Sequence, residues 1–254
     1  MFYFVQLSLL ALITVPLAVL TTALGLFDAQ GKRVYRINKL WTWLILRLGG
    51  ISVRVHGLEN IVPDRQYIFI ANHQSNIDIP VLTQSLGRFQ LRWIAKKELL
   101  WVPFFGWAMW ATKHITINRA DRLAAVKSLA RAEERLAAGI SIVIFPEGTR
   151  SHDGKMLRFK KGGFLLAVQS RTPVVPVAIK GSSRILPVGG WRLRSGVVDV
   201  FVDKPIAVDG FHIGKLRPLS EAARQVIAEH LDQASPTNNE PKPTAARRLE
   251  KRSA

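Results

Sequence analysis

The chain has 254 residues, a formal net charge of +18 and no cysteine. Without cysteine there are no disulfides or thiolate metal sites, and the composition is compatible with a reducing cytoplasm. The length suits one domain with a sizeable hydrophobic core plus a shorter additional segment. The excess of basic side chains fits a negatively charged partner, either a nucleic acid or an anionic membrane surface.

The N-terminal segment predicts membrane attachment. Residues 1–27 contain no charged side chain, and a hydrocarbon core of about 30 Å needs only ~20 apolar residues to be crossed. Pro16 and Gly25 interrupt the regularity of this apolar segment. A secretory signal would carry basic residues before its apolar stretch, and residues 1–4 have none. We therefore expect an uncleaved anchor.

The next segment combines basic residues with apolar residues at helical spacing. Its basic residues are Lys32, Arg33, Arg36 and Lys39. By the positive-inside tendency they predict that the following domain lies on the cytoplasmic face of the inner (plasma) membrane. The apolar pattern at 34–48 predicts a helix in the headgroup layer, with Arg36, Lys39 and Trp43 in an interfacial belt, although a helix docked on the domain would show the same pattern. We assign residues 1–49 to membrane-associated helices.

Residues 50–234 alternate between strand and helix patterns. Apolar, β-branched runs predict strands at 52–55, 67–71, 91–94, 114–117, 140–144, 174–179 and 197–202, and helical periodicity predicts helices at 120–138, 163–169 and 219–233. This alternation favours an α/β fold with a mixed sheet covered by helices, following the N-terminal helical membrane anchor. Residues 235–254 are rich in Pro, Asn, Lys and Arg, which predicts a basic disordered tail.

A histidine and an aspartate five residues apart follow the predicted strand at 67–71. A continuous helix or strand would keep His73 and Asp78 apart, whereas a turn after His73 and a helix starting near Pro80 would let them meet. An aspartate bonded to Nδ1 would fix the tautomer and leave Nε2 free to accept a proton. Alternatively, Asp78 only caps the helix and His73 is a loop histidine. The spacing alone does not decide between the two.

A second polar motif, at 147–150, follows the predicted strand at 140–144. Arg150 offers a planar fork suited to phosphate oxygens. More positive charge follows at Lys155, Arg158, Lys160 and Lys161, and the glycine pair at 162–163 could open a helix whose free amides favour an anion. The alternative is a solvated turn in which Arg150 pairs with Glu147.

Together, these motifs resemble the glycerolipid acyltransferase family, most of all its bacterial 1-acyl-glycerol-3-phosphate acyltransferases of the PlsC type. The family's first block, Asn-His followed after four residues by Asp, is present at 72–78, and its third block, Phe-Pro-Glu-Gly-Thr-Arg-Ser, matches 145–151 at each position. Residues 95–107 resemble the lysine-bearing stretch that precedes the family's second block. Residues 175–179 resemble its fourth block. Block two departs from the family pattern, because Asn118 stands where the family usually has aspartate before Arg119.

The resemblance implies a mechanism and substrates. In this family the histidine takes a proton from the acceptor hydroxyl, which attacks an acyl thioester directly, so His73 would be the base and Asp78 its holder. The acceptor would be the sn-2 hydroxyl of 1-acyl-glycerol-3-phosphate (lysophosphatidic acid), the donor acyl-CoA or acyl carrier protein, and the product phosphatidic acid. No cofactor is implied. The lack of cysteine and of a Gly-x-Ser-x-Gly elbow agrees with direct attack.

The resemblance also implies a set of phosphate-binding residues. By similarity, the acceptor phosphate would be organised by Glu147, Gly148, Thr149, Arg150, Lys96 and Arg119. Because the Glu147 carboxylate repels phosphate, we expect it to orient Arg150 or a hydroxyl instead. The family also allows both N-terminal helices to embed in one leaflet, so spanning and one-sided insertion both remain open.

Two other functions fit part of the sequence. An acyltransferase of the same fold could use another lysolipid, such as a lyso-ornithine lipid, but that acceptor lacks the phosphate that Arg150 suits. A membrane-tethered nucleic-acid-binding protein would explain the charge, yet no DNA- or RNA-binding motif is found, and membrane phospholipids explain the charge with fewer assumptions. The remaining histidines are scattered without a metal-binding spacing, so we expect no metal site.

Overall fold

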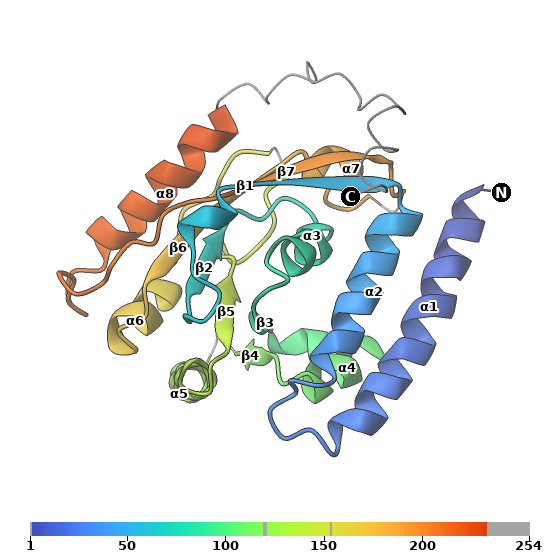
Figure 1. Cartoon of the computed structure of the whole chain (residues 1–254), viewed down its shortest axis with the longest axis horizontal. Coiled ribbons are helices and arrows are strands. Elements are labelled where there is room, and N and C mark those ends of the chain that lie inside the picture. Colours follow the sequence, from blue (N-terminus) through green and yellow to red (C-terminus); the bar gives the residue numbers. More distant parts are fainter. Residues whose placement is uncertain (1, 119–120, 153, 191, 233–254) are drawn as a thin grey trace, which may run out of the picture.

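The predicted strands pair into one mixed sheet. The computed structural model describes residues 2–118, 121–152, 154–190 and 192–232 (Figure 1). Within them the sheet has the order β1-β7-β6-β2-β5-β3-β4. The strands are β1 (Ile51–His56), β2 (Ile68–Ala71), β3 (Leu91–Lys96), β4 (Ile115–Ile117), β5 (Ser141–Ile144), β6 (Val174–Lys180) and β7 (Gly196–Val202). All pairs are parallel except β6 with β7, which is antiparallel. The expected mixed sheet is therefore confirmed.

Helices cover both faces of this sheet (Figure 1). They are α1 (Phe2–Gly25), α2 (Tyr35–Leu48), α3 (Asp78–Ser85), α4 (Phe105–Ala111), α5 (Arg122–Ala137), α6 (Gly162–Gln169), α7 (Ser182–Ile185) and α8 (Arg217–Asp232), with short 3-10 turns η1 (Leu58–Asn60) and η2 (Lys97–Trp101). The sequence patterns did not predict η1, η2, α4 or α7. The predicted tail at 235–254 and Arg119 lie outside the described residues.

The hydrophobic core has two layers because side chains alternate along the strands. In β2, Ile68 and Ile70 face α5, α6 and α8, whereas Phe69 and Ala71 face α2 and α3. Every residue of β2 and β5 is buried. Such apolar runs are typical of parallel strands covered on both sides, and they place the ends of β2 and β5 in the middle of the molecule.

Helix α1 is apolar, yet little of it is buried. Within the described residues it alone is long and apolar enough to cross a membrane, and only 17% of its window Ser8–Gly25 is buried. Leu12 is 70% exposed, and Pro16 lies within the continuous helix. These features fit the expected anchor, whose insertion remains a prediction.

Helix α2 docks on the α/β domain through one face. Thr42 and Leu46 are buried in that face. Lys39, which we expected in an interfacial belt, instead donates a hydrogen bond to the Gly87 carbonyl. The opposite face exposes Leu40 and Trp43. One face of α2 is therefore docked on the domain, as the alternative interpretation of this pattern expected. The assignment of residues 1–49 to a unit separate from the domain remains a prediction.

A buried arginine fastens the connection between α1 and α2. Arg92 of β3 is fully buried and donates to the carbonyls of Leu91 and Gln30. Its guanidinium lies 5.2 Å from the centre of the Tyr35 ring. Burial lowers the pKa of Arg92 to about 10, so it remains charged at neutral pH. Hydrogen bonds from a charged donor are stronger than neutral ones, which makes this a firm attachment of the N-terminal helices to the sheet.

Candidate active site

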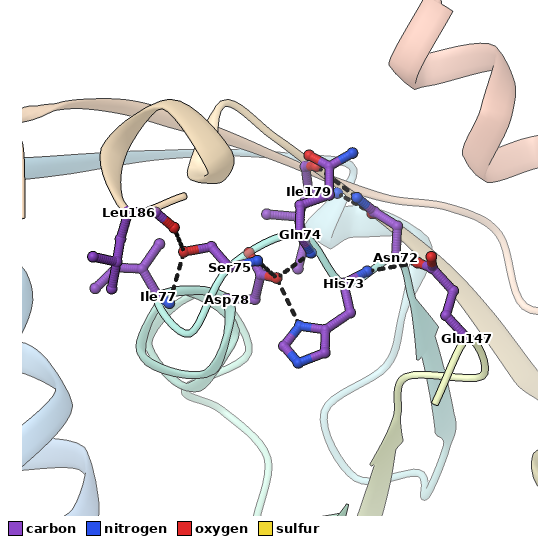
Figure 2. Close-up of polar contacts among 9 residues, drawn as sticks. All are labelled: Asn72, His73, Gln74, Ser75, Ile77, Asp78, Glu147, Ile179 and Leu186. Atoms are coloured by element: carbon purple, nitrogen blue, oxygen red, sulfur yellow. Dashed lines mark hydrogen bonds and ion pairs between the residues drawn. The ribbon is translucent and has the colours of Figure 1, made fainter. Parts of the chain in front are cut away.

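The two polar motifs meet at the carboxyl edge of the sheet, where ligands bind in α/β proteins. β2 and β5 are parallel neighbours, so the segments that follow them leave from the same edge. Asn72, the first residue after β2, is fully buried and exchanges two hydrogen bonds with the Ile179 backbone, at 2.9 and 2.7 Å (Figure 2). Asn72 thus continues the pairing between β2 and β6 and fixes where the chain turns at His73.

The predicted contact between His73 and Asp78 is present. His73 Nδ1 lies 2.8 Å from Asp78 Oδ2 (Figure 2). The same oxygen accepts the backbone N–H groups of Gln74 and Ser75, each at 2.8 Å. The cap position of α3 is Ile77, which makes no side-chain cap, so the interpretation of Asp78 as a mere helix cap is wrong. An ionised carboxylate only accepts hydrogen bonds, so with Asp78 in that form Nδ1 is the donor, and a neutral imidazole then has its lone pair on Nε2.

The imidazole is also fixed by stacking. The His73 ring lies 3.8 Å from the Phe145 ring, centroid to centroid, with only 7° between their planes. Phe145 follows β5 and packs in turn against Trp93 of β3, at 5.5 Å between centroids. The hydrogen bond of Nδ1 to Asp78 and the stack on Phe145 act on the same ring, so its orientation is set before any substrate arrives.

Glu147 holds the two motifs together through their backbones. Its side chain is buried, and its two oxygens accept the N–H groups of His73 and Leu157, each at 2.8 Å. The Ser151 N–H donates to the His73 carbonyl at 3.0 Å. Burial raises the pKa of the Glu147 carboxyl. The expectation that Glu147 orients Arg150 or a hydroxyl does not match these contacts, because both oxygens are used by backbone amides.

The predicted phosphate-binding residues surround the same edge. Gly148 adopts a φ of 77°, which glycine tolerates best, and Thr149 beside it is exposed. Arg150 is half-buried and forms no ion pair with any described residue, so the alternative turn pairing with Glu147 is not found. Lys96 is exposed at the end of β3, at the same edge. Their contact with a phosphate stays a prediction.

An apolar cavity adjoins the site, and the sequence interpretation missed it. It contains about 680 Å³ of empty space between α1, α2, α4 and β3, part of it open to solvent, and its walls include Leu17, Trp41, Trp93, Phe105, Met109 and His114. Trp93 is the residue that packs on Phe145, whose ring stacks on His73. The aromatic run at 101–110 was the available signal, but periodicity does not show which elements enclose a space.

His114 lines this cavity as a neutral imidazole. Its Nδ1 accepts the Trp93 backbone N–H, and the Asn38 amide lies 3.3 Å from Nε2. Burial against apolar walls, with the nearby charge of Arg92, lowers the pKa of His114 to about 3. Among the residues that the structure describes, no group of three or more His, Asp or Glu side chains could hold a metal ion.

The fold and the site define an α/β protein that presents an aspartate-oriented histidine at the carboxyl edge of its sheet. The model of the acyltransferase family matches residues 52–180. Relatives that are named acyltransferases also align with most of the chain. The chain therefore belongs to this family.

Named relatives are found in bacteria and plants. The chain is 36% identical over 196 residues to a 1-acyl-sn-glycerol-3-phosphate acyltransferase of Pseudomonas aeruginosa, covering 76% of this chain and 74% of the relative. It is also 36% identical over 210 residues to the chloroplastic acyltransferase LPAT1 of Arabidopsis thaliana, covering 82% of this chain but only 57% of that relative.

A solved structure shares the whole architecture. The crystal structure of PlsC, the 1-acyl-sn-glycerophosphate (LPA) acyltransferase from Thermotoga maritima, aligns with a TM-score of 0.65 and 28% identity. The alignment covers 92% of this chain and 99% of that one, so the similarity extends to the N-terminal helices. The resemblance drawn from the motifs is thereby confirmed at the level of family and fold.

Proposed function

We propose that the protein transfers a fatty acyl group from an acyl thioester to the sn-2 hydroxyl of 1-acyl-glycerol-3-phosphate and so makes phosphatidic acid. The observation that carries this proposal is the His73–Asp78 pair, held at 2.8 Å with Nε2 left to accept a proton. The names of the relatives from Pseudomonas and Arabidopsis supply the acceptor.

His73 acts as the general base in this mechanism. Its Nε2 takes the proton of the acceptor hydroxyl while the hydroxyl oxygen attacks the thioester carbonyl carbon. Asp78 stabilises the imidazolium that forms. The tetrahedral intermediate collapses by breaking the carbon–sulfur bond, and the imidazolium returns the proton to the departing thiolate. The products are an ester and a free thiol, and no acyl-enzyme forms.

Arg150 and Lys96 hold the acceptor phosphate, with the Gly148 and Thr149 backbone beside them. A guanidinium without an ion-pair partner among the described residues, at the edge where the base lies, supports this assignment for Arg150. Arg119 joins them by resemblance to the family. Glu147 has a different part, because its hydrogen bonds to His73 and Leu157 position the loop that carries Arg150.

The apolar cavity behind Phe145 receives a fatty acyl chain. Support comes from its wall of aliphatic and aromatic side chains and from its contact, through Trp93, with the stack that holds His73. In this proposal the partners of the protein are an acyl-CoA or acyl carrier protein donor, lysophosphatidic acid and membrane phospholipids, and no nucleic acid. The exposed apolar α1 supports attachment of the protein to the inner membrane, and the basic residues Lys32, Arg33, Arg36 and Lys39 that follow it support a catalytic domain on the cytoplasmic face.

Purified protein assayed with both donors and a panel of lysolipids tests the proposal. We expect acylation of lysophosphatidic acid and no acylation of lyso-ornithine lipid, because only the former carries the phosphate that Arg150 suits. Preference for lyso-ornithine lipid would overturn the acceptor assignment while keeping the acyl-transfer chemistry.

A further inference from the structure

A second pocket, polar rather than apolar, is lined in part by Gln74, the residue that follows His73. It contains about 1170 Å³ of empty space, part of it open to solvent. Its walls come from the end of β6, from α7 and from the segment leading into β7. β6 is parallel to β2, so this pocket opens at the same sheet edge as His73. Neither the motifs nor the proposed mechanism uses it.

This pocket carries a large excess of positive charge. Four of its lining residues are cationic, namely Arg54, Lys180, Arg184 and Arg194, and Asp199 is the acidic one. The Asp199 carboxylate is already engaged, since Arg54 binds it through two nitrogens at 2.7 and 2.8 Å. Arg184 and Arg194 are exposed and form no ion pair with any described residue. The pocket therefore lacks a counter-charge for two guanidinium groups.

Hydrogen bonds connect the walls of the pocket to Gln74 and Ser75, the two residues that follow His73. Gln74 directly follows the base, lines the pocket and donates to the Gly154 carbonyl at 2.8 Å. Ser75 Oγ donates to the Leu186 carbonyl at 2.6 Å, which ties the end of α7 to the same turn (Figure 2). The Arg194 N–H in turn donates to the Ile185 carbonyl at 3.0 Å, so the segment with Arg194 is fastened to α7.

The position of these charges distinguishes the two substrates. In the acceptor, the phosphate and the reacting hydroxyl sit on neighbouring carbons of one glycerol, so its phosphate stays close to His73. In a coenzyme A thioester, the reacting carbon and the phosphates are separated by the long pantetheine arm. The cationic residues of the pocket come from β1, β6, α7 and the segment before β7, and not from the loops that carry His73 and Arg150, which suits the second arrangement.

We propose that this pocket binds the phosphorylated nucleotide end of an acyl-coenzyme A donor, with Arg184 and Arg194 contacting its phosphates. The proposal rests on the proposed acyl transfer and names its donor. A pocket that admits a small molecule suits a nucleotide with several phosphates. An acyl carrier protein would instead present its own folded surface, and a flat basic patch would serve it better than a pocket.

The double variant R184A/R194A in the full-length protein tests this assignment. We expect the KM for palmitoyl-CoA to rise about tenfold or more, as the loss of charge-assisted hydrogen bonds predicts, with the KM for lysophosphatidic acid unchanged. The preference of the wild type for palmitoyl-CoA over palmitoyl-pantetheine, which lacks the nucleotide, should shrink in parallel. The matched control is K127A/R131A, which removes the same charge from the exposed face of α5 and should leave each KM unchanged.

Calorimetric titration with coenzyme A alone, without acceptor, separates this proposal from the proposed function. Binding to wild type that weakens in R184A/R194A supports the pocket even if the acceptor is another lysolipid. An unchanged affinity and KM would overturn it. So would a rise only in the KM for lysophosphatidic acid, or a loss only with acyl carrier protein. Failure of wild type to acylate lysophosphatidic acid with either donor would overturn the proposed function instead.

Discussion

Glu147 Oε1 accepts the backbone N–H of His73 at 2.8 Å, across 74 residues of sequence. The other oxygen accepts the Leu157 N–H at 2.8 Å. One buried carboxylate therefore connects the loop that carries His73 to the loop that carries Arg150. Its two oxygens face two donors, a requirement that a carboxylate meets and an amide does not.

Glu147→Gln should accordingly destabilise the protein. One oxygen of the carboxylate becomes an NH₂ group that faces a backbone N–H, which leaves a buried donor unpaired and costs about 1–3 kcal/mol. Urea unfolding in detergent measures this loss. Thr149→Ala, on the same loop but exposed, serves as the control and should unfold as wild type does. An unchanged stability in Glu147→Gln would mean that the two hydrogen bonds are not maintained in solution.

Removal of the base should nearly abolish turnover. We expect His73→Ala to lower kcat by on the order of a hundredfold or more, as general-base catalysis is usually worth 10²–10⁴. Asp78→Asn should cause a comparable loss, because an amide can favour the wrong imidazole tautomer. His212→Ala, at an exposed loop position, is the matched control. A folded His73→Ala protein with near-normal kcat would refute the mechanism.

Arg150→Lys should act on one substrate. Lysine keeps the positive charge but lacks the planar fork that binds two phosphate oxygens. The KM for lysophosphatidic acid should therefore rise several-fold, while the KM for the acyl donor stays near its wild-type value. Steady-state kinetics with each substrate varied in turn measures both constants. If both rise equally, Arg150 supports the loop and does not contact the phosphate.

His114 should make the stability fall on acidification. Its pKa is lowered to about 3 in the folded protein from an ordinary 6.5. Between these values the unfolded chain binds a proton that the folded protein does not, so stability rises with pH across this window. The slope approaches about 1.4 kcal/mol per pH unit at most. Unfolding at pH 7 and pH 5 should differ more for wild type than for His114→Gln. Equal differences would show that His114 is protonated in the folded protein.

Membrane attachment through α1 should resist salt. Apolar insertion does not depend on charge, whereas exposed charges are screened within about 8 Å at physiological ionic strength. The protein should therefore stay with lipid vesicles in 1 M salt, on the order of seven times the physiological level. Leu12→Lys with Leu20→Lys should weaken retention, whereas Leu123→Lys with Val126→Lys, at exposed positions of α5, should not. Release of wild type by salt would show that α1 is not inserted.

Local patterns predicted the strands and the longer helices, and they allowed one contact of the site. Apolar runs located the seven strands to within two residues, because strands covered on both faces are made mostly of apolar residues. Local geometry also allowed the contact between His73 and Asp78 without deciding it. A turn ending in a helix that starts at Asp78, with Pro80 in its first turn, brings two residues together that are five positions apart.

Only the tertiary structure decided what surrounds that pair. The stack of Phe145 on His73, the amide partners of Glu147 and the cavity between α1, α2, α4 and β3 join segments that are distant in the sequence. Periodicity reports which face of an element is buried but not which neighbour buries it. Glu147 shows this limit: its partners are the backbone amides of His73 and Leu157, and backbone amides, which every residue except proline carries, leave no signature in the sequence.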